Sequence, residues 1–327
     1  MNAQQDGMTR ISIVVPVHNA ANTLDRCVSS LSQQKGNLQI ILVNDGSTDN
    51  SLAMCLTWAQ RDARIEVVSQ DNAGVSAARN RGLDRCLSEW VCFVDSDDYL
   101  EPDACEQLRS IVNNPQTDMV MFGHTVEDAT QSSSVIRQET NNLTIVDRDE
   151  ALRLTLSSHG YKGYIWNRMY RTSVINAQPR IRFSEEAHYC EDLLFNVAYA
   201  KRVSSVALTD NVLYHYCDSA TSVVHTITEK NETFAVAMDE VMELLPEHLQ
   251  PLAASGYAIM AMELLFWSYE QHDKTRIRRY YHMVHNFWPD YRTMRTEQSV
   301  KTRVRMVGAR YCPSLFCSMW NVLKKII

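Results

Sequence analysis

The 327-residue sequence lacks the features that mark secreted, membrane-spanning and disulfide-bonded proteins. Its first ten residues hold no apolar leader, and no stretch approaches the roughly 18 apolar residues that a membrane-spanning helix needs. Its nine cysteines are an odd number and form no C-x-x-C pair, which predicts reduced thiols. We therefore expect a cytoplasmic protein with no secretion signal and no spanning helix.

Motifs of several common enzyme classes are missing as well. No G-x-G-x-x-G follows the first apolar run and no G-x-x-x-x-G-K-S/T occurs, which argues against dinucleotide dehydrogenases and P-loop phosphotransferases. No G-x-S-x-G nucleophile elbow occurs either. His282 and His285 share a helix face by their spacing, but with no third ligand in view they predict no zinc site.

The composition that is present is ordinary for a globular protein, with 45% hydrophobic and 22% charged residues. The length suits one large domain, or one domain plus an extension. A formal net charge of −7 argues against a general nucleic-acid binder. The charge is uneven, because residues Asp290–Ile327 hold eight Lys or Arg and only two Asp or Glu.

Short apolar runs alternate with amphipathic stretches from residue 10 to about residue 125. Strands are expected at Ile11–Val17, Leu38–Val43, Ile65–Ser69, Trp90–Val94 and Asp118–Phe122. Helices are expected at Thr23–Gln34, Asp49–Arg61, Val75–Cys86 and from Asp103 onward. Such alternation with short connections predicts an α/β fold whose sheet is mostly parallel. After residue 225 only helices are expected.

Carboxylates gather where two of these strands end. The buried run Trp90–Val94 leads directly into Asp95, Asp97 and Asp98, and the second strand leads into Asp45. Because the carboxyl ends of parallel strands share one edge of a sheet, these acids should face one ligand crevice. A divalent cation would relieve their mutual repulsion. The alternative is a solvated turn that caps the next helix.

The third strand is followed by Asn72–Gly82, a segment of small residues at the start of a helix. Small residues there allow close backbone approach, and a helix N-terminus favours anions. Arg79 could reach a phosphate or a base edge bidentately. The alternative is an arginine exposed on a helix face.

Five segments, taken in order, carry a resemblance to a known family. They are Val14–Asn19 (V-V-P-V-H-N), Val43–Asp49 (V-N-D-G-S-T-D), Asn72–Gly82, Asp95–Asp98 (D-S-D-D) and Glu191–Asp192. Together they resemble the inverting family 2 glycosyltransferases of the GT-A fold over residues 10–225. The resemblance implies a mostly parallel central sheet flanked by helices in a GT-A domain at residues 8–225. Residues 226–327 would form a helical extension.

The resemblance also assigns roles to particular residues. It implies donor-nucleotide contacts for Pro16, His18, Asn19, Asp45, Arg79 and Asp95. The D-x-D pair would bind Mn²⁺ or Mg²⁺ through Asp97, with Asp95 towards the ribose or the metal shell. Asp192, or alternatively Glu191, would be the general base that deprotonates the acceptor. The other reading of these two acids is a helix start favoured by the helix dipole.

Four further positions either depart from the family pattern or extend it. His18 stands where many relatives have tyrosine, and Arg168 stands where lysine is common. Trp166 and Arg168 are candidate acceptor-site residues, although Trp166 suits a core aromatic equally well. His225 is a candidate neighbour of the diphosphate or the metal.

The C-terminal stretch combines basic and apolar residues. These are Lys301, Arg303, Arg305 and Arg310 with Leu315, Phe316, Met319, Trp320, Val322, Leu323, Ile326 and Ile327. Such a stretch suits the surface of an anionic membrane, which places the protein at the inner face of the plasma membrane. The alternative is a helix packed on the body or in a homodimer.

These observations together predict an inverting glycosyltransferase that moves a hexosyl or N-acetylhexosaminyl group from a UDP-linked donor. The acceptor would be a saccharide or lipid-linked saccharide in bacterial capsule, exopolysaccharide or lipopolysaccharide assembly, a setting that rests on family analogy. A sugar-nucleotide-binding protein without turnover and a nucleotidyltransferase of related fold are the alternatives. No nucleic-acid partner is expected.

Overall fold

The computed structural model describes residues 9–113, 117–128, 131–135, 143–157, 161–218 and 227–323. The chain forms two compact units. The first comprises Met1–Ala151, Tyr164–Glu185 and Ala198–Thr221, and the second comprises Leu152–Gly163, Glu186–Val197 and Ser222–Ile327. Two short segments, Leu152–Gly163 and Glu186–Val197, therefore belong to the second unit although the chain returns to the first unit after each of them.

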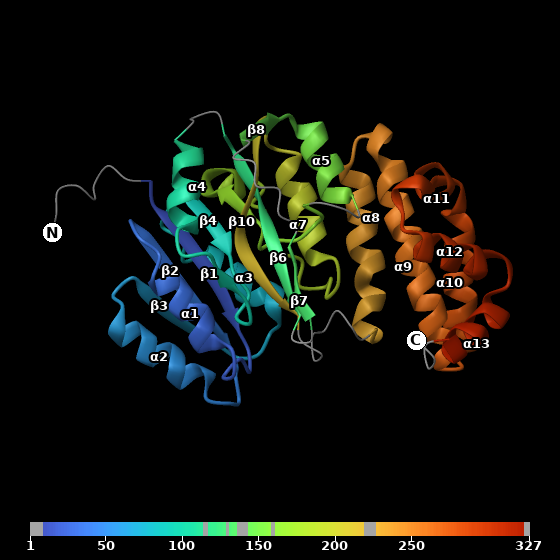
Figure 1. Ribbon diagram of the computed structural model, residues 1–327, viewed down its shortest axis with the longest axis horizontal. Coiled ribbons are helices and arrows are strands. Elements are labelled where there is room, and N and C mark those ends of the chain that lie inside the picture. Colours follow the sequence, from blue (N-terminus) through green and yellow to red (C-terminus); the bar gives the residue numbers. More distant parts are fainter. Residues whose placement is uncertain are drawn as a thin grey trace. The chain divides into compact units, whose positions relative to one another are not determined.

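The first unit is built on a single mixed sheet (Figure 1). Its strands are β1 (Ile11–Val17), β2 (Leu38–Asp45), β3 (Ile65–Gln70), β4 (Trp90–Phe93), β5 (Tyr99–Leu100), β6 (Met119–Asp128), β7 (Gln131–Val135), β8 (Leu143–Val146), β9 (Arg168–Arg171) and β10 (Val206–Asp218). Their order is β3-β2-β1-β4-β9-β6-β10-β5, with β7 beside β6 and β8 beside β10.

The parallel part of the sheet coincides with the region of regular alternation. Strands β3, β2, β1 and β4 are all parallel, and β1 and β2 are buried along their whole length. Continuous burial is expected for parallel strands that are covered on both faces. Beyond β4 the sheet is mixed, because β9 runs antiparallel to both β4 and β6.

Helices of the first unit cover this sheet (Figure 1). They are α1 (Leu24–Ser32), α2 (Ser51–Arg61), α3 (Val75–Leu83), α4 (Ala104–Val112) and α6 (Thr172–Asn176). Helix α1 buries Leu24, Cys27, Val28 and Leu31, the spacing of one helix face. Helix α3 lies close to β1, since a Cβ at Gly82 would come within 2.3 Å of Val14 Cγ1. Helices α5 (Arg148–Leu156) and α7 (Glu191–Ala200) each contribute to both units.

The second unit is helical and is organised around α9 (Gln250–Glu270). The others are α8 (Phe234–Leu244), α10 (Lys274–Asn286), α11 (Trp288–Met294), α12 (Val300–Tyr311) and α13 (Pro313–Leu323), with short 3₁₀ turns at Glu229–Thr233, Glu247–Leu249 and Arg295–Glu297. The stretch Glu247–Glu270 is long and apolar enough to cross a membrane by length and composition, but 67% of its apolar 18-residue window is buried inside the protein. A helix that is apolar on all sides and surrounded by other helices is a core helix.

Candidate functional site

The carboxyl ends of β1, β2, β3 and β4 meet at one edge of the sheet. Val17 lies opposite Asn44, Asp45 lies opposite Gln70, and Val14 lies opposite Phe93. The loops that leave these strands therefore start side by side. Three of the six residues predicted to bind a nucleotide, His18, Asn19 and Asp95, lie in these loops, and Asp45 is the last residue of β2. This placement is expected for a ligand crevice of an open α/β sheet.

Asp45 fastens the loop that leads into α3. Its side chain is buried, Oδ1 accepts hydrogen bonds from Ala73 N and Gln70 Nε2 at 2.9 and 2.8 Å, and Oδ2 accepts one from Gly74 N at 2.9 Å. Backbone N–H groups at a helix start are good partners for a carboxylate. The donor-nucleotide contact of Asp45 remains a prediction, and the structure adds that this side chain holds the loop before α3 in place.

His18 lies in the same corner and is held by its neighbours. Its Nδ1 lies 2.8 Å from the carbonyl oxygen of Asp45, so Nδ1–H donates and Nε2 is left to accept from Asn19 Nδ2 at 3.1 Å. The amide of Asn72 lies 3.3 Å from Nε2. The backbones of Gly46 and Asn72 pack closely here, because a Cβ at Gly46 would lie 2.5 Å from Asn72 N.

Asn19 joins the first and second loops. Its backbone has φ 50°, and its Oδ1 accepts from Thr48 N at 2.8 Å while Ser47 Oγ accepts from Asn19 N at 3.1 Å. Both His18 and Asn19 are exposed, whereas Pro16 is buried within β1. Of the predicted turn, the two exposed side chains are thus the ones that a nucleotide could reach.

Arg79 is buried and holds Asp95. Its Nη2 donates to Asp95 Oδ1 at 3.1 Å, and its guanidinium lies 5.4 Å from the ring centre of Phe183. The ring is fixed by the backbone of its own residue, which exchanges hydrogen bonds of 2.9 Å with the Asn80 amide in both directions. The alternative of an exposed arginine on a helix face is therefore wrong. A buried charge pair of this kind sets the orientation of the half-buried Asp95.

The three acids after β4 have different surroundings. Asp98 has no exposed surface, and its carboxylate accepts from Tyr214 Oη at 2.6 Å and from Cys217 N at 2.7 Å. Burial, and then the charges of Asp95 and Asp97, raise the pKa of Asp98 to about 8. The same Tyr214 hydroxyl accepts from Asp95 N at 3.1 Å. Asp98 thus anchors the acidic turn to β10.

Asp97 is the exposed member of the three. Arg26 fixes its backbone by donating to the carbonyl oxygen at 2.6 Å, while its carboxylate accepts no hydrogen bond from another residue in the described part of the chain. Partial desolvation of the carboxylate by the surrounding protein, and then the negative charge of Asp95, raise the pKa of Asp97. An uncompensated oxygen donor of this kind suits a hard cation.

The aromatic segment before β9 belongs to the core. Trp166 is 5% exposed and stacks with Tyr164 and Tyr214, whose ring centres lie 4.5 and 4.6 Å from its own. Arg168 has no exposed surface and donates to Asn167 Oδ1 at 2.6 Å and to the carbonyl oxygen of Tyr164. These positions favour the core reading of Trp166, and they lend no support to an acceptor role for either residue.

The predicted catalytic acids begin a helix. Glu191 and Asp192 occupy the first turn of α7, directly after Cys190, whose φ is 66°. Acidic side chains are favoured at this position by the helix dipole. Their role as base stays a prediction. The candidate His225 lies outside the described residues.

Sequence reasoning missed Phe183, Tyr214 and Cys217. Each lies more than 80 residues from the acids or the arginine that it contacts. The signal that could have drawn attention to Tyr214 is the strand-like run Val203–Tyr216, most of which lies in β10. Nothing in their local sequence marks Phe183 or Cys217.

Comparisons with known proteins give a family and a fold. The sequence profile described as "Glycosyl transferase family 2" matches residues 12–177. The chain is similar to the putative glycosyltransferase EpsH of Bacillus subtilis, at 31% identity over 67% of this chain and 64% of that protein. It is also similar to the uncharacterized glycosyltransferase EpsJ of the same organism, at 30% identity over 71% and 66% of the two chains. The matches thus span just under two thirds of both relatives.

Among solved structures, the chain resembles TarS 1–349 of S. aureus in complex with UDP-GlcNAc. The TM-score is 0.61 at 16% sequence identity, and the match covers 89% of this chain and 93% of that one. The same TarS fragment in complex with UDP gives a TM-score of 0.59. At this identity the likeness shows the fold alone, an α/β architecture with a central sheet flanked by helices, as expected from the sequence.

Proposed function

The chain belongs to glycosyl transferase family 2, and on that premise we propose that it transfers a sugar from a nucleotide-sugar donor to a hydroxyl of its acceptor. The donor would be UDP-linked, and the anomeric configuration would invert. The observation that carries this proposal is the convergence, at one sheet edge, of the Asp45 loop, the Arg79–Asp95 pair and the exposed Asp97. Such an edge is where α/β proteins bind nucleotides.

The residues at this edge suit a cation held partly by the donor. Asp97, with Asp95 beside it, would bind Mn²⁺ or Mg²⁺, and Asp98 is already occupied by Tyr214 and Cys217. Within the described ranges no group of three or more His, Cys, Asp or Glu encloses a metal site. Mg²⁺ commonly takes one or two carboxylates and completes its shell with substrate phosphates and water. When bound, the ion would neutralise the growing negative charge of the diphosphate leaving group.

The chain's own residues would then orient the donor and move one proton. Arg79 holds Asp95 for the ribose or the metal shell, and the Asp45 loop presents the base pocket. The acceptor oxygen forms a bond to the anomeric carbon from the face opposite the diphosphate, while the bond from that carbon to the phosphate oxygen breaks. Asp192 takes the hydroxyl proton, and the nucleoside diphosphate leaves with the bonding electrons.

The catalytic assignment is tested by comparing Asp192→Asn with Glu191→Gln. If Asp192 is the base, its amide variant loses about 10²–10⁴-fold in transfer rate, whereas Glu191→Gln keeps most of it. UDP affinity, measured by calorimetry, should be unchanged in both variants. The opposite ranking would assign the base to Glu191. Absence of turnover in the wild type would favour a sugar-nucleotide-binding protein instead.

The pathway is proposed from the names of similar proteins. One segment of the chain is 39% identical over 97 residues to the chondroitin synthase of Pasteurella multocida. The matched segment covers 10% of that protein. Polysaccharide assembly is therefore the setting we propose. A nucleotidyltransferase would release pyrophosphate from a nucleoside triphosphate, and that activity is the one to exclude.

We also propose that the C-terminal helices contact an anionic membrane from the cytoplasmic side. Helices α12 and α13 present large apolar side chains that are 50 to 66% exposed, namely Val300, Val304, Val307, Tyr311, Leu315 and Met319. The four on α12 follow the spacing of one helix face, opposite the buried Met306 and Ala309. The segment 298–327 contains six Lys or Arg and no acid. An apolar face beside basic side chains suits an anionic lipid surface.

Membrane contact is tested with substitutions rather than a deletion, because Phe316 and Arg305 pack on α9 through Phe266 and Glu263. The double variant Val304→Ser with Leu315→Ser should lose co-sedimentation with phosphatidylglycerol vesicles. The matched control is Leu56→Ser with Leu87→Ser, two exposed leucines of the first unit. Equal vesicle binding by all three proteins would contradict the proposal. So would a wild-type dimer that the double variant converts to a monomer without any vesicle binding.

A further inference from the structure

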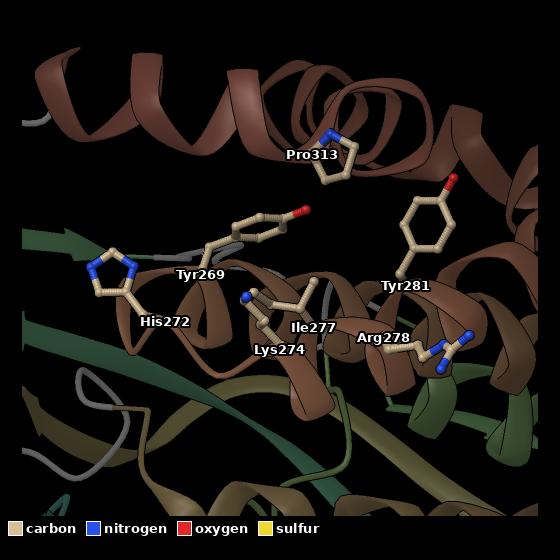
Figure 2. Close-up of a pocket in the computed structure, with 7 residues that line it drawn as sticks. All are labelled: Tyr269, His272, Lys274, Ile277, Arg278, Tyr281 and Pro313. Atoms are coloured by element: carbon tan, nitrogen blue, oxygen red, sulfur yellow. The ribbon is translucent and has the colours of Figure 1, made fainter.

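The helical unit carries an open cavity that the proposed transfer reaction does not use. It has a volume of about 870 Å³ and is lined by side chains from the end of α9, from α10 and from the start of α13 (Figure 2). Small-molecule sites usually measure roughly 300–1,000 Å³. No residue of the strand-edge site lines it, so this cavity stands or falls independently of the proposed transfer reaction.

The charged side chains of this cavity are cationic. Lys274 and Arg278 lie four residues apart and therefore on one face of α10, and His272 precedes the helix (Figure 2). Neither Lys274 nor Arg278 has an acidic partner within the described part of the chain, and no acid lines the cavity. The cavity is therefore a place of uncompensated positive charge.

The other arginines of α10 show the contrast. Arg276 lies 2.9 Å from Glu229 and 2.6 Å from Glu232, and Arg279 lies 3.6 Å from Glu232. The acids of this region thus pair with Arg276 and Arg279 rather than with Lys274 or Arg278. A ligand that binds beside those two cations would meet no competing carboxylate in the cavity lining.

The remaining lining is aromatic and apolar. Tyr269 and Tyr281 contribute rings and hydroxyl groups, and Ile277 and Pro313 contribute apolar surface (Figure 2). Neither hydroxyl donates to another residue within the described ranges. Tyrosine offers a flat apolar face with a polar tip, which suits a ligand that is both ring-shaped and hydroxylated. Convergent polar groups on an apolar lining are the usual composition of a ligand site.

We propose that this cavity binds an anionic saccharide, with a phosphate or carboxylate group at Lys274 or Arg278 and its ring against the tyrosines. A neighbouring cavity of about 600 Å³ shares Lys274 and Arg278 and adds Thr275, Arg279 and His282. Lys274 and Arg278 thus border both cavities, and the two cavities together suit a chain of more than one sugar. Arginine is well matched to phosphate and carboxylate oxygens by its planar fork.

The test is calorimetry on the full chain with UDP and Mg²⁺ present to fill the donor site. The carboxylate probe is trigalacturonate and the phosphate probe is glucose 6-phosphate, with maltotriose and glucose as their neutral counterparts. The anionic sugars should bind and the neutral ones should not. Lys274→Gln with Arg278→Gln should weaken binding by about tenfold or more. Thermal unfolding confirms that the variant is folded.

The matched control is Lys230→Gln with Arg292→Gln, which removes the same charge from exposed positions outside the cavity lining. It should leave binding of the anionic sugars unchanged. Equal binding of maltotriose and trigalacturonate, or an unchanged affinity in the Lys274/Arg278 variant, would overturn the proposal. Inorganic phosphate that binds as tightly as both anionic sugars would overturn the saccharide part. Loss of activity in Asp97→Asn with intact binding here would separate the two sites.

Discussion

Asp45 and Asp98 are buried carboxylates that hold loops in place. Asp45 accepts from Ala73 N and Gly74 N, and Asp98 accepts from Cys217 N and the Tyr214 hydroxyl. The family resemblance gives Asp95 and Asp97 different roles, but it does not say which acid of the D-S-D-D turn is buried. What distinguishes them is contact with β10, more than 100 residues later, which buries Asp98 and leaves Asp97 towards solvent.

The variant Asp45→Asn tests this loop-holding role. An amide has one acceptor oxygen instead of two, so at least one N–H of Ala73 or Gly74 loses its partner. Because these N–H groups are only part-buried, the cost should lie near the lower end of the roughly 1–3 kcal/mol expected for a buried donor left unpaired. We expect the free energy of unfolding in urea to fall by that amount and UDP affinity, measured by calorimetry, to fall with it. Asp71→Asn, at an exposed residue of the same loop, is the control. Unchanged stability and affinity in Asp45→Asn would contradict the account.

Helices and strands with a clear pattern of apolar residues could be predicted from the sequence, and those without such a pattern could not. Strands β1 to β4 were expected within two residues of their observed bounds, because each is a short apolar run between turns. Strand β9, with the sequence R-M-Y-R, was not expected as a strand. It is buried between β4 and β6, so its pairing depends on partners far away in the chain rather than on its own alternation.

The turn between α2 and β3 is fastened to the end of α1 by Asp62 and Arg64. Asp62 accepts from Ser32 Oγ at 2.7 Å and from Arg64 Nη2 at 2.6 Å, and Arg64 donates to the carbonyl oxygens of Gln34 and Ser32. The hydrogen bonds from Arg64 lower the pKa of Asp62 to about 2. An unfolded aspartate has a pKa of about 3.9, so the ionised form stabilises the fold above about pH 4.

The variant Asp62→Asn should therefore destabilise the protein in a pH-dependent way. At pH 7 we expect a loss of about 1–2 kcal/mol in the free energy of unfolding. Because the wild type loses the contribution of Asp62 as the pH falls through about 4 towards 2, the gap should narrow at pH 3. Urea unfolding of both proteins at the two pH values measures it. A gap of the same size at pH 7 and pH 3 would rule out the ion pair as its source.

At the scale of the whole molecule, the family and the fold class were both available from the ordered motifs. The positions of Asp45 and Asp95 at one sheet edge followed from the prediction that their strands are parallel, because the carboxyl ends of parallel strands share one edge. The sequence did not reveal which side chains are buried. For this reason an acceptor role was assigned to Arg168, which has no exposed surface. The two interleaved units were also not foreseen, since two short segments before residue 198 join the helical unit.

The central claim is that the chain turns over a nucleotide sugar with a divalent cation held at Asp97. The most direct test is release of nucleoside diphosphate from a panel of UDP- and GDP-sugars with Mn²⁺, with Mg²⁺ and with EDTA. We predict release of UDP from at least one UDP-sugar, dependent on the cation and lost in Asp97→Asn while the variant stays folded. Full release in EDTA, or full activity in Asp97→Asn, would contradict the account.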